Sequence, residues 1–295
     1  MLLGVAGPPL FGTGPDPVAI RDFAQAVEDM GFNHYGFAER VVQNDVSKIP
    51  EMAGRPANHR GLFNEVFTLM SFLAGVTKRI ELMSCILILP IRPTALVAKQ
   101  AAHAQMLSGG RIRLGVAVGG SPLEYEAMSV DFHTRGKRME EQIEVLRRLW
   151  TEDSVFAQTR FHNLRYATLN PRPEVPIPIW IGSGNVNAPM PAERLLRRAA
   201  RIADGFTAMS LLPPEQAGDL VSLLRQYTGE YSREPGSFGV EGDITLTGKT
   251  PEEWGRETRL WREAGADRLI LRMRDMNTQA QLDNLKTYIQ EVGLG

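Results

Sequence analysis

Residues 80–120, IELMSCILILPIRPTALVAKQAAHAQMLSGGRIRLGVAVGG, contain the pattern that decides the fold. Ile80–Leu89 is nearly all apolar, which is typical of a parallel strand buried on both faces. Thr94–Leu107 has a helical pattern that stops at Gly109-Gly110, and Ile112–Val118 is another apolar strand. This order of strand, helix and strand predicts a right-handed crossover within a parallel sheet.

The same unit recurs along the whole chain. The further strands are predicted at Leu2–Ala6, His34–Ala38, Ile177–Ile181, Gly205–Met209, Asp243–Thr247 and Arg268–Met273. Helices are predicted at 17–30, 62–76, 94–107, 139–150, 192–203, 214–231, 251–264 and 282–292. Eight such units in 295 residues fit an α/β fold, a closed (β/α)8 TIM barrel forming a single domain over residues 1–295. An open doubly wound sheet is the rival architecture.

Two segments interrupt this rhythm. Residues 41–61, an inserted loop after strand 2, are polar, contain Gly and Pro, and are too long for an ordinary connection. We expect them to form a lid. An irregular segment also follows the fourth helix, between Trp150 and the strand at Ile177–Ile181.

Composition excludes several classes of function. The chain has 33 Lys+Arg against 34 Asp+Glu, a net charge of −1, which argues against a nucleic-acid partner. No apolar run approaches the roughly 18 residues of a membrane helix. Cys85 is the only cysteine, so there is no disulfide, and the five histidines lack metal-ligand spacing. We therefore expect a soluble, cytoplasmic protein without a metal.

Gly182-Ser183-Gly184 is the most informative motif. It follows a predicted strand and precedes a helix that starts near Pro191, so backbone amides and the Ser183 hydroxyl can hold an anion such as a phosphate. A dinucleotide fingerprint fails, because Asn187 takes the third glycine position and Asp204 precedes the next strand. A glycine-rich turn without a ligand stays the alternative.

A basic stripe follows this motif on the next helix. Arg194, Arg197, Arg198 and Arg201 are spaced i, i+3, i+4 and i+7. In a chain of net charge −1, the favoured interpretation is a solvated outer helix face.

The run from Arg92 to Trp150 closely resembles the luciferase-like monooxygenase family, and more narrowly its coenzyme F420-dependent oxidoreductases. AVEDMGFNHYGFAER, TKRIELMSCILILP and PIPIWIGSGN fall in the order of that family. The resemblance covers about Leu2 to Met209 and implies a (β/α)8 barrel that holds F420 or FMN at its C-terminal mouth.

The resemblance also implies roles for particular residues. A bulge with a non-prolyl cis peptide would back the ring at Ser84-Cys85 or Cys85-Ile86. Gly119 and Gly120 would border the ring, and Gly182, Ser183 and Gly184 would hold the cofactor phosphate. Many relatives form dimers, so a homodimer is an expectation of the resemblance.

The chain departs from the family pattern at two places. Glu39-Arg40 replaces Asp-His, and an arginine stays protonated, so it cannot take a proton as that histidine does in alcohol-oxidising relatives. Glu39 is the remaining base candidate, and a Glu39–Arg40 ion pair of purely structural value is the alternative. Gly120-Ser121 replaces Trp-Asn or a catalytic glutamate, so a bulky wall of the pocket is expected to be missing.

These observations predict an enzyme that transfers hydride between F420 and a small organic substrate, with Glu39 and Arg40 as its candidate catalytic residues. Without a base at the histidine position, reduction of an activated C=C or C=N bond is favoured over alcohol oxidation. An FMN-dependent monooxygenase is the runner-up. A barrel that binds flavin without turnover, or that has lost its cofactor, is the alternative from another class.

Overall fold

A computed structural model describes residues 1–7, 16–50, 62–184, 188–209, 212–273 and 277–294. Its centre is a closed barrel of parallel strands in the order β1-β10-β9-β8-β7-β4-β3-β2. The barrel strands are β1 (Leu2–Ala6), β2 (His34–Phe37), β3 (Glu81–Ile88), β4 (Ile112–Ala117), β7 (Ile179–Ser183), β8 (Gly205–Ala208), β9 (Gly239–Thr245) and β10 (Arg268–Arg272). The predicted TIM barrel is confirmed. The open doubly wound sheet is excluded because the strand order closes on itself, with β1 joining the last strand, β10, to β2.

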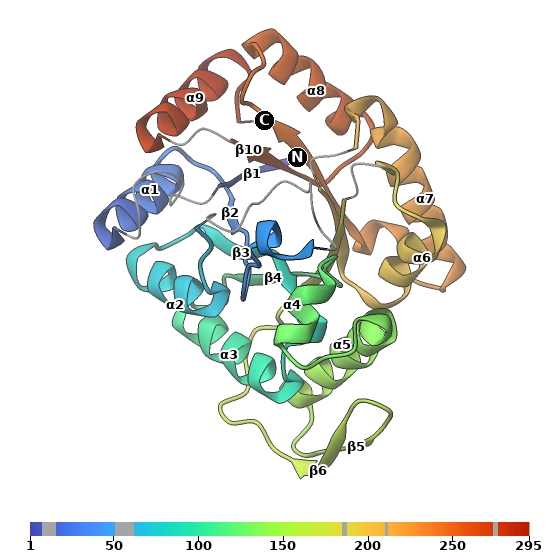
Figure 1. Cartoon of the computed structure of the whole chain (residues 1–295). Coiled ribbons are helices and arrows are strands. Elements are labelled where there is room, and N and C mark those ends of the chain that lie inside the picture. The colour runs from blue at the N-terminus through green and yellow to red at the C-terminus, as the bar shows by residue number, and fades with distance from the viewer. Residues whose placement is uncertain (8–15, 51–61, 185–187, 210–211, 274–276, 295) are drawn as a thin grey trace.

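Helices surround the barrel as an outer layer (Figure 1). They are α1 (Pro17–Asp29), α2 (Val66–Val76), α3 (Thr94–Leu107), α5 (Arg135–Thr151), α6 (Glu193–Ile202), α7 (Ala217–Glu230), α8 (Pro251–Glu263) and α9 (Thr278–Glu291). Their apolar faces pack on the strands; in α1 the buried side chains include Ile20, Phe23, Ala24 and Val27, spaced for one helical face. None of the described helices is long and apolar enough to cross a membrane.

A short helix and a pair of strands were not predicted. A short helix, α4 (Pro122–Ala127), follows β4 and begins at Ser121, whose side chain accepts a hydrogen bond from the Glu124 amide. The segment expected to be irregular instead contains an antiparallel pair, β5 (Val155–Gln158) and β6 (Asn163–Ala167), at the rim of the molecule (Figure 1). Residues in β5 alternate between buried and exposed, which is the pattern of a strand with one solvated face.

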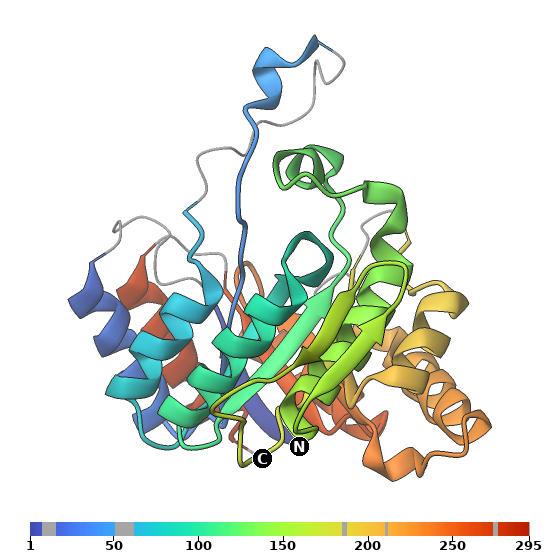
Figure 2. The same cartoon turned by 90° about the horizontal axis from the view of Figure 1, so that it is seen from below.

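The expected lid at 41–61 is described only in part. Residues 51–61 lie outside the described residues. Residues 41–50, with a short 3-10 helix at Val46–Lys48, extend beyond the end of the barrel at which the strands finish (Figure 2). Whether the segment closes over the barrel stays a prediction.

The barrel interior has two levels. Near the ends at which the strands begin, Arg113 and Glu241 form a buried ion pair, with His34 2.9 Å from Glu241. Above it, Ala6, Met83, Cys85 and Ile270 make a small apolar cluster with Met209 packed against it. This cluster is the floor on which the cavity at the mouth rests.

Candidate cofactor and active site

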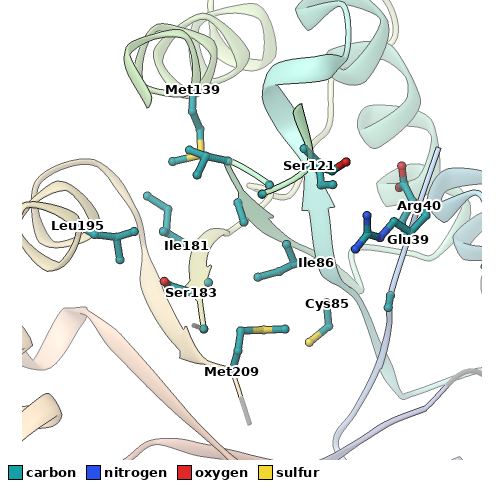
Figure 3. A pocket seen from close by; sticks show the side chains of 18 of the residues that line it. Glu39, Arg40, Cys85, Ile86, Ser121, Met139, Ile181, Ser183, Leu195 and Met209 are labelled. Carbon is teal, nitrogen blue, oxygen red and sulfur yellow. The ribbon is translucent and has the colours of Figure 1, made fainter. Parts of the chain in front are cut away.

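A cavity of about 870 Å³ opens at the C-terminal mouth, where the loops of a TIM barrel place reactive groups. Its walls are mostly apolar (Figure 3). The lining residues are Ala38, Glu39, Arg40, Phe63, Cys85, Ile86, Ile88, Ala117, Val118, Gly119, Gly120, Ser121, Met139, Ile181, Gly182, Ser183, Gly184, Leu195 and Met209. Every residue predicted for the site is among them except Ser84.

The third strand forms one wall of the cavity. The cis peptide lies at Cys85–Ile86, the second of the two expected positions, and the register between β3 and β4 shifts between Ser84 and Leu87. Ser84 is fully buried; its hydroxyl donates to the carbonyl oxygen of Gly115 (2.9 Å) and accepts from the Gly115 amide (3.0 Å). Ser84 therefore anchors the bulge from behind, while Cys85 and Ile86 face the cavity.

Three glycines make room for this bulge. A Cβ at Gly182 would overlap the side chain of Ile86, and one at Gly115 would overlap the carbonyl oxygen of Ser84. A Cβ at Gly119, which has φ +67°, would lie 2.7 Å from Ile88. Gly182 is thus required by packing, a reason independent of the anion-binding argument made from the sequence.

Gly120 contrasts with these positions. A Cβ there would have no atom within 4 Å, so the position borders open space. The missing bulky wall inferred from Gly120-Ser121 is therefore consistent with the geometry of the cavity.

Glu39 and Arg40 have separate partners. The Glu39 carboxylate pairs with the guanidinium of Arg92, whereas Arg40 lies 3.4 Å from Glu124. The Glu39–Arg40 ion pair considered as an alternative is therefore wrong. Glu124 is buried and also accepts the backbone N–H of Val41 (3.1 Å), so it holds the chain just after β2.

The two side chains also differ in exposure. Burial raises the pKa of Glu39, against the opposing effect of Arg92. The Arg40 side chain is 44% exposed and its guanidinium turns toward the cavity (Figure 3). A ligand in the cavity therefore meets the half-exposed guanidinium of Arg40, which lies 3.4 Å from Glu124, and the buried carboxylate of Glu39, which is paired with Arg92.

Cys85 lies against another ion pair. Arg272 contacts the carboxylate of Asp243 at 2.6 Å and the sulfur of Cys85 at 3.5 Å. Burial raises the pKa of the Cys85 thiol, so the thiol stays protonated. Cys85 is therefore a small wall residue of the cavity and not a nucleophile.

The predicted anion segment closes the opposite side of the cavity. β7 ends at Ser183, Gly184 follows, and residues 185–187, with Asn187, lie outside the described residues. The next helix, α6, begins at Glu193 with Ala192 as its N-cap, close to the expected start near Pro191. Asp204 binds the backbone N–H of Ile179 (2.8 Å) at the start of β7, so it has a structural role far from the motif.

Several site residues escaped the sequence analysis. Arg92 and Glu124 determine where Glu39 and Arg40 point, and Phe63, Met139 and Met209 complete the walls. For Glu124 a signal existed, since Ser121-Pro122-Leu123-Glu124 has the spacing of a helix start. Arg92 carried no local signal, because its partner is far away in the sequence.

Comparisons with known proteins agree with this geometry. The profile of the luciferase-like monooxygenase family matches residues 2–287. The chain belongs to this family, whose members use F420 or FMN.

An uncharacterised protein of Mycobacterium tuberculosis is 42% identical over 155 residues, 52% of this chain and 49% of that protein. The chain thus matches about half the length of this relative. A pyrimidine monooxygenase, RutA, of Allorhizobium ampelinum is 33% identical over 48% of this chain and 37% of its own.

An F420-dependent glucose-6-phosphate dehydrogenase of Kineococcus radiotolerans is 25% identical over 83% of this chain and 68% of its own. The solved structure of the monooxygenase RslO1 from Streptomyces bottropensis superposes with a TM-score of 0.80. The superposition covers 99% of this chain and 98% of RslO1, and the two sequences are 16% identical. At this identity the similarity shows a common fold.

Proposed function

We propose that the protein binds F420 in the cavity at the barrel mouth and transfers hydride to the activated C=C or C=N bond of a small organic substrate. The observation that carries the proposal is the fixed positive charge of Arg40, aimed into a cavity with mostly apolar walls. The F420-dependent relative that matches 83% of the chain supports the choice of cofactor.

The residues fit a flat tricyclic ring with a phosphate. The bulge at Cys85 and Ile86 gives the ring a wall, and the open space at Gly120 leaves room beside it. Ser183 and Gly184, at the end of β7, would hold the phosphate. When bound, the cofactor supplies the hydride chemistry, while the chain supplies orientation and exclusion of water.

Arg40 favours reduction of the substrate over alcohol oxidation. Oxidising an alcohol requires a group that takes the hydroxyl proton, and a guanidinium keeps its own protons at all working pH values. In the proposed direction the electron-poor carbon receives the hydride and its neighbouring atom takes a proton from water. Arg40 stabilises the negative charge that develops during this transfer.

The alternative is an FMN-dependent monooxygenase, which the similarity to RutA supports. A barrel that has lost its cofactor has less support, because the cavity and the bulge are both present.

Fluorescence titration of the apo-protein with F420, FMN and FAD, each in a separate experiment, tests the proposal. We expect F420 to bind most tightly, and we expect reduced F420 to be oxidised by an activated enone or imine without uptake of oxygen. Tight binding of FMN with no binding of F420, or oxygen uptake that matches substrate turnover, would overturn the proposal in favour of the monooxygenase.

A further inference from the structure

A second cavity of about 420 Å³ lies beside the first, between the beginnings of α5 and α6. We call it the basic hollow. Its lining includes His133, Arg135, Lys137, Arg194 and Arg198, and no acidic side chain is among the described residues that line it. In a chain of net charge −1, five basic residues around one cavity are a local excess that points to a negatively charged ligand.

The basic hollow is continuous with the cofactor cavity. Val118, Ser183 and Leu195 line both cavities, and Ser183 and Leu195 lie on the same side of the close view (Figure 3). A ligand whose phosphate is held beside Ser183 can therefore extend from the first cavity into the second.

Of the five basic side chains, only Arg198 forms an ion pair among the described residues. Arg198 is neutralised by Glu140 (2.6 Å), and Arg135 lies over the Phe132 ring (3.7 Å). Lys137 and Arg194, both exposed, form no ion pair with any residue that the structure describes. These two charges are available to a ligand.

The placement of these cations at helix beginnings makes an anion more favourable still. The amino end of a helix carries partial positive charge, so basic residues there repel it, and a bound anion would relieve this repulsion. Arg135 and Lys137 are in the first turn of α5, which has no acidic residue. Arg194 is in the first turn of α6 beside Glu193, whose carboxylate pairs with Arg197 (2.6 Å). Neither helix has a side-chain cap, and the amino end of α5 adds to the positive potential of the hollow.

We infer that the basic hollow binds a second anionic group of the cofactor, namely carboxylates of a tail that continues beyond the phosphate held at Ser183. The inference rests on the proposed function and deepens it. Lys137 and Arg194 select a deazaflavin that carries an oligoglutamate tail over a flavin whose side chain ends in one phosphate. A ligand that ends at its phosphate leaves both charges unpaired.

Binding of F420 to purified protein, measured by fluorescence with and without its oligoglutamate tail, tests this inference. We expect Lys137→Ala and Arg194→Ala each to weaken binding of tailed F420 about fivefold, the effect of one close pair at the protein surface. Binding of tail-less F420 and of FMN should change less than about twofold, and added salt should reduce the advantage of the tail.

Arg259→Ala is the matched control, because Arg259 is an exposed arginine on α8 outside the hollow. We expect it to leave all three affinities unchanged. Equal affinity of the wild-type protein for tailed and tail-less F420, with both hollow variants unchanged, would overturn the inference while leaving F420 as the cofactor. Failure of the wild-type protein to bind F420 in either form would instead overturn the proposed function.

Discussion

The inside of the barrel and its mouth use charge in opposite ways. Inside, Arg113 contacts Glu81 (2.7 Å) and Glu241 (2.8 Å), and His34 reaches Glu241 at 2.9 Å. The side chains of Arg113, Glu241 and His34 are at most 1% exposed. At the mouth, Arg40 is half-exposed, and Lys137 and Arg194 have no ion-pair partner among the described residues.

This difference separates structural from functional charges. A buried charge must be compensated, since an isolated ion in a protein interior is very unfavourable. An uncompensated charge persists only where water or a ligand reaches it. We therefore expect changes inside the barrel to reduce stability and changes at the mouth to affect binding and catalysis.

The largest expected effect is that of Arg113→Met. The substitution leaves Glu241 buried without its guanidinium and removes the stacking of Arg113 on Trp180 (4.4 Å). We expect the free energy of unfolding to fall by about 3–5 kcal/mol, measured by urea denaturation. Arg259→Ala is the surface control, and a loss below about 1 kcal/mol in Arg113→Met would show that the barrel interior does not depend on this ion pair.

Gly182→Ala should have the next largest effect, because its methyl group would overlap Ile86. Overpacking of this kind lowers stability by about 1–3 kcal/mol, and displacing Ile86 should also weaken F420 binding. Thermal unfolding and fluorescence titration measure the two effects. Gly120→Ala, which adds a methyl group to open space, is the control; equal behaviour of both variants would mean that the bulge tolerates displacement.

At the mouth, Arg40→Gln should slow hydride transfer about tenfold, because the charge it removes is partly screened by solvent. The Kd for F420 should change little, whereas stability should fall modestly because the buried carboxylate of Glu124 loses its charged partner. Arg40→Lys keeps the positive charge and should retain more of the rate in single-turnover kinetics. If neither substitution changes the rate of hydride transfer, Arg40 has no role in catalysis.

A further expected effect is on the pH dependence of stability. Burial lowers the pKa of His34, so the unfolded chain binds a proton there below about pH 6.5 while the folded chain does not. Stability should therefore fall as the pH drops from 7 to 5, by up to about 1.4 kcal/mol per pH unit. Arg113 and His34 lower the pKa of Glu241 against the cost of burial, so its contribution is lost only at more acidic pH, below its unfolded value of about 4.3.

Denaturation curves at several pH values test this dependence. His34→Asn should be less stable overall, but its stability should change less between pH 7 and pH 5. An unchanged slope in this variant would assign the dependence to another group.

The sequence predicted the barrel because its strands have a strong local signal. Leu2–Ala6 matches β1, whereas β9 extends from Gly239 to Thr245 and not over Asp243–Thr247. Two glycines and Glu241 interrupt the apolar pattern of this strand, so the sequence did not indicate its first half. The glycines are required by tertiary packing, because the rings of Trp180 and Trp261 occupy the space where Gly239 and Gly242 would carry a Cβ.

The site was predictable where it follows strand ends and motifs. Gly119, Ser183 and Gly184 line the cavity as expected. The pairing of Glu39 with Arg92 was not predictable, because it joins residues on different units of the barrel. The basic stripe on α6 lies on an exposed or half-buried face, as predicted, and within it Arg197, Arg198 and Arg201 form ion pairs while Arg194 lines the basic hollow.

The close fit between Ile86 and Gly182 has a consequence for redesign of the pocket. The two positions lie on different strands, β3 and β7. The side chain of Ile86 fills the space that a side chain at residue 182 would occupy. Shortening residue 86 to alanine should therefore make alanine tolerable at residue 182, so that the double variant recovers stability that Gly182→Ala alone loses. Reshaping this wall will require exchanges across strands, made in pairs.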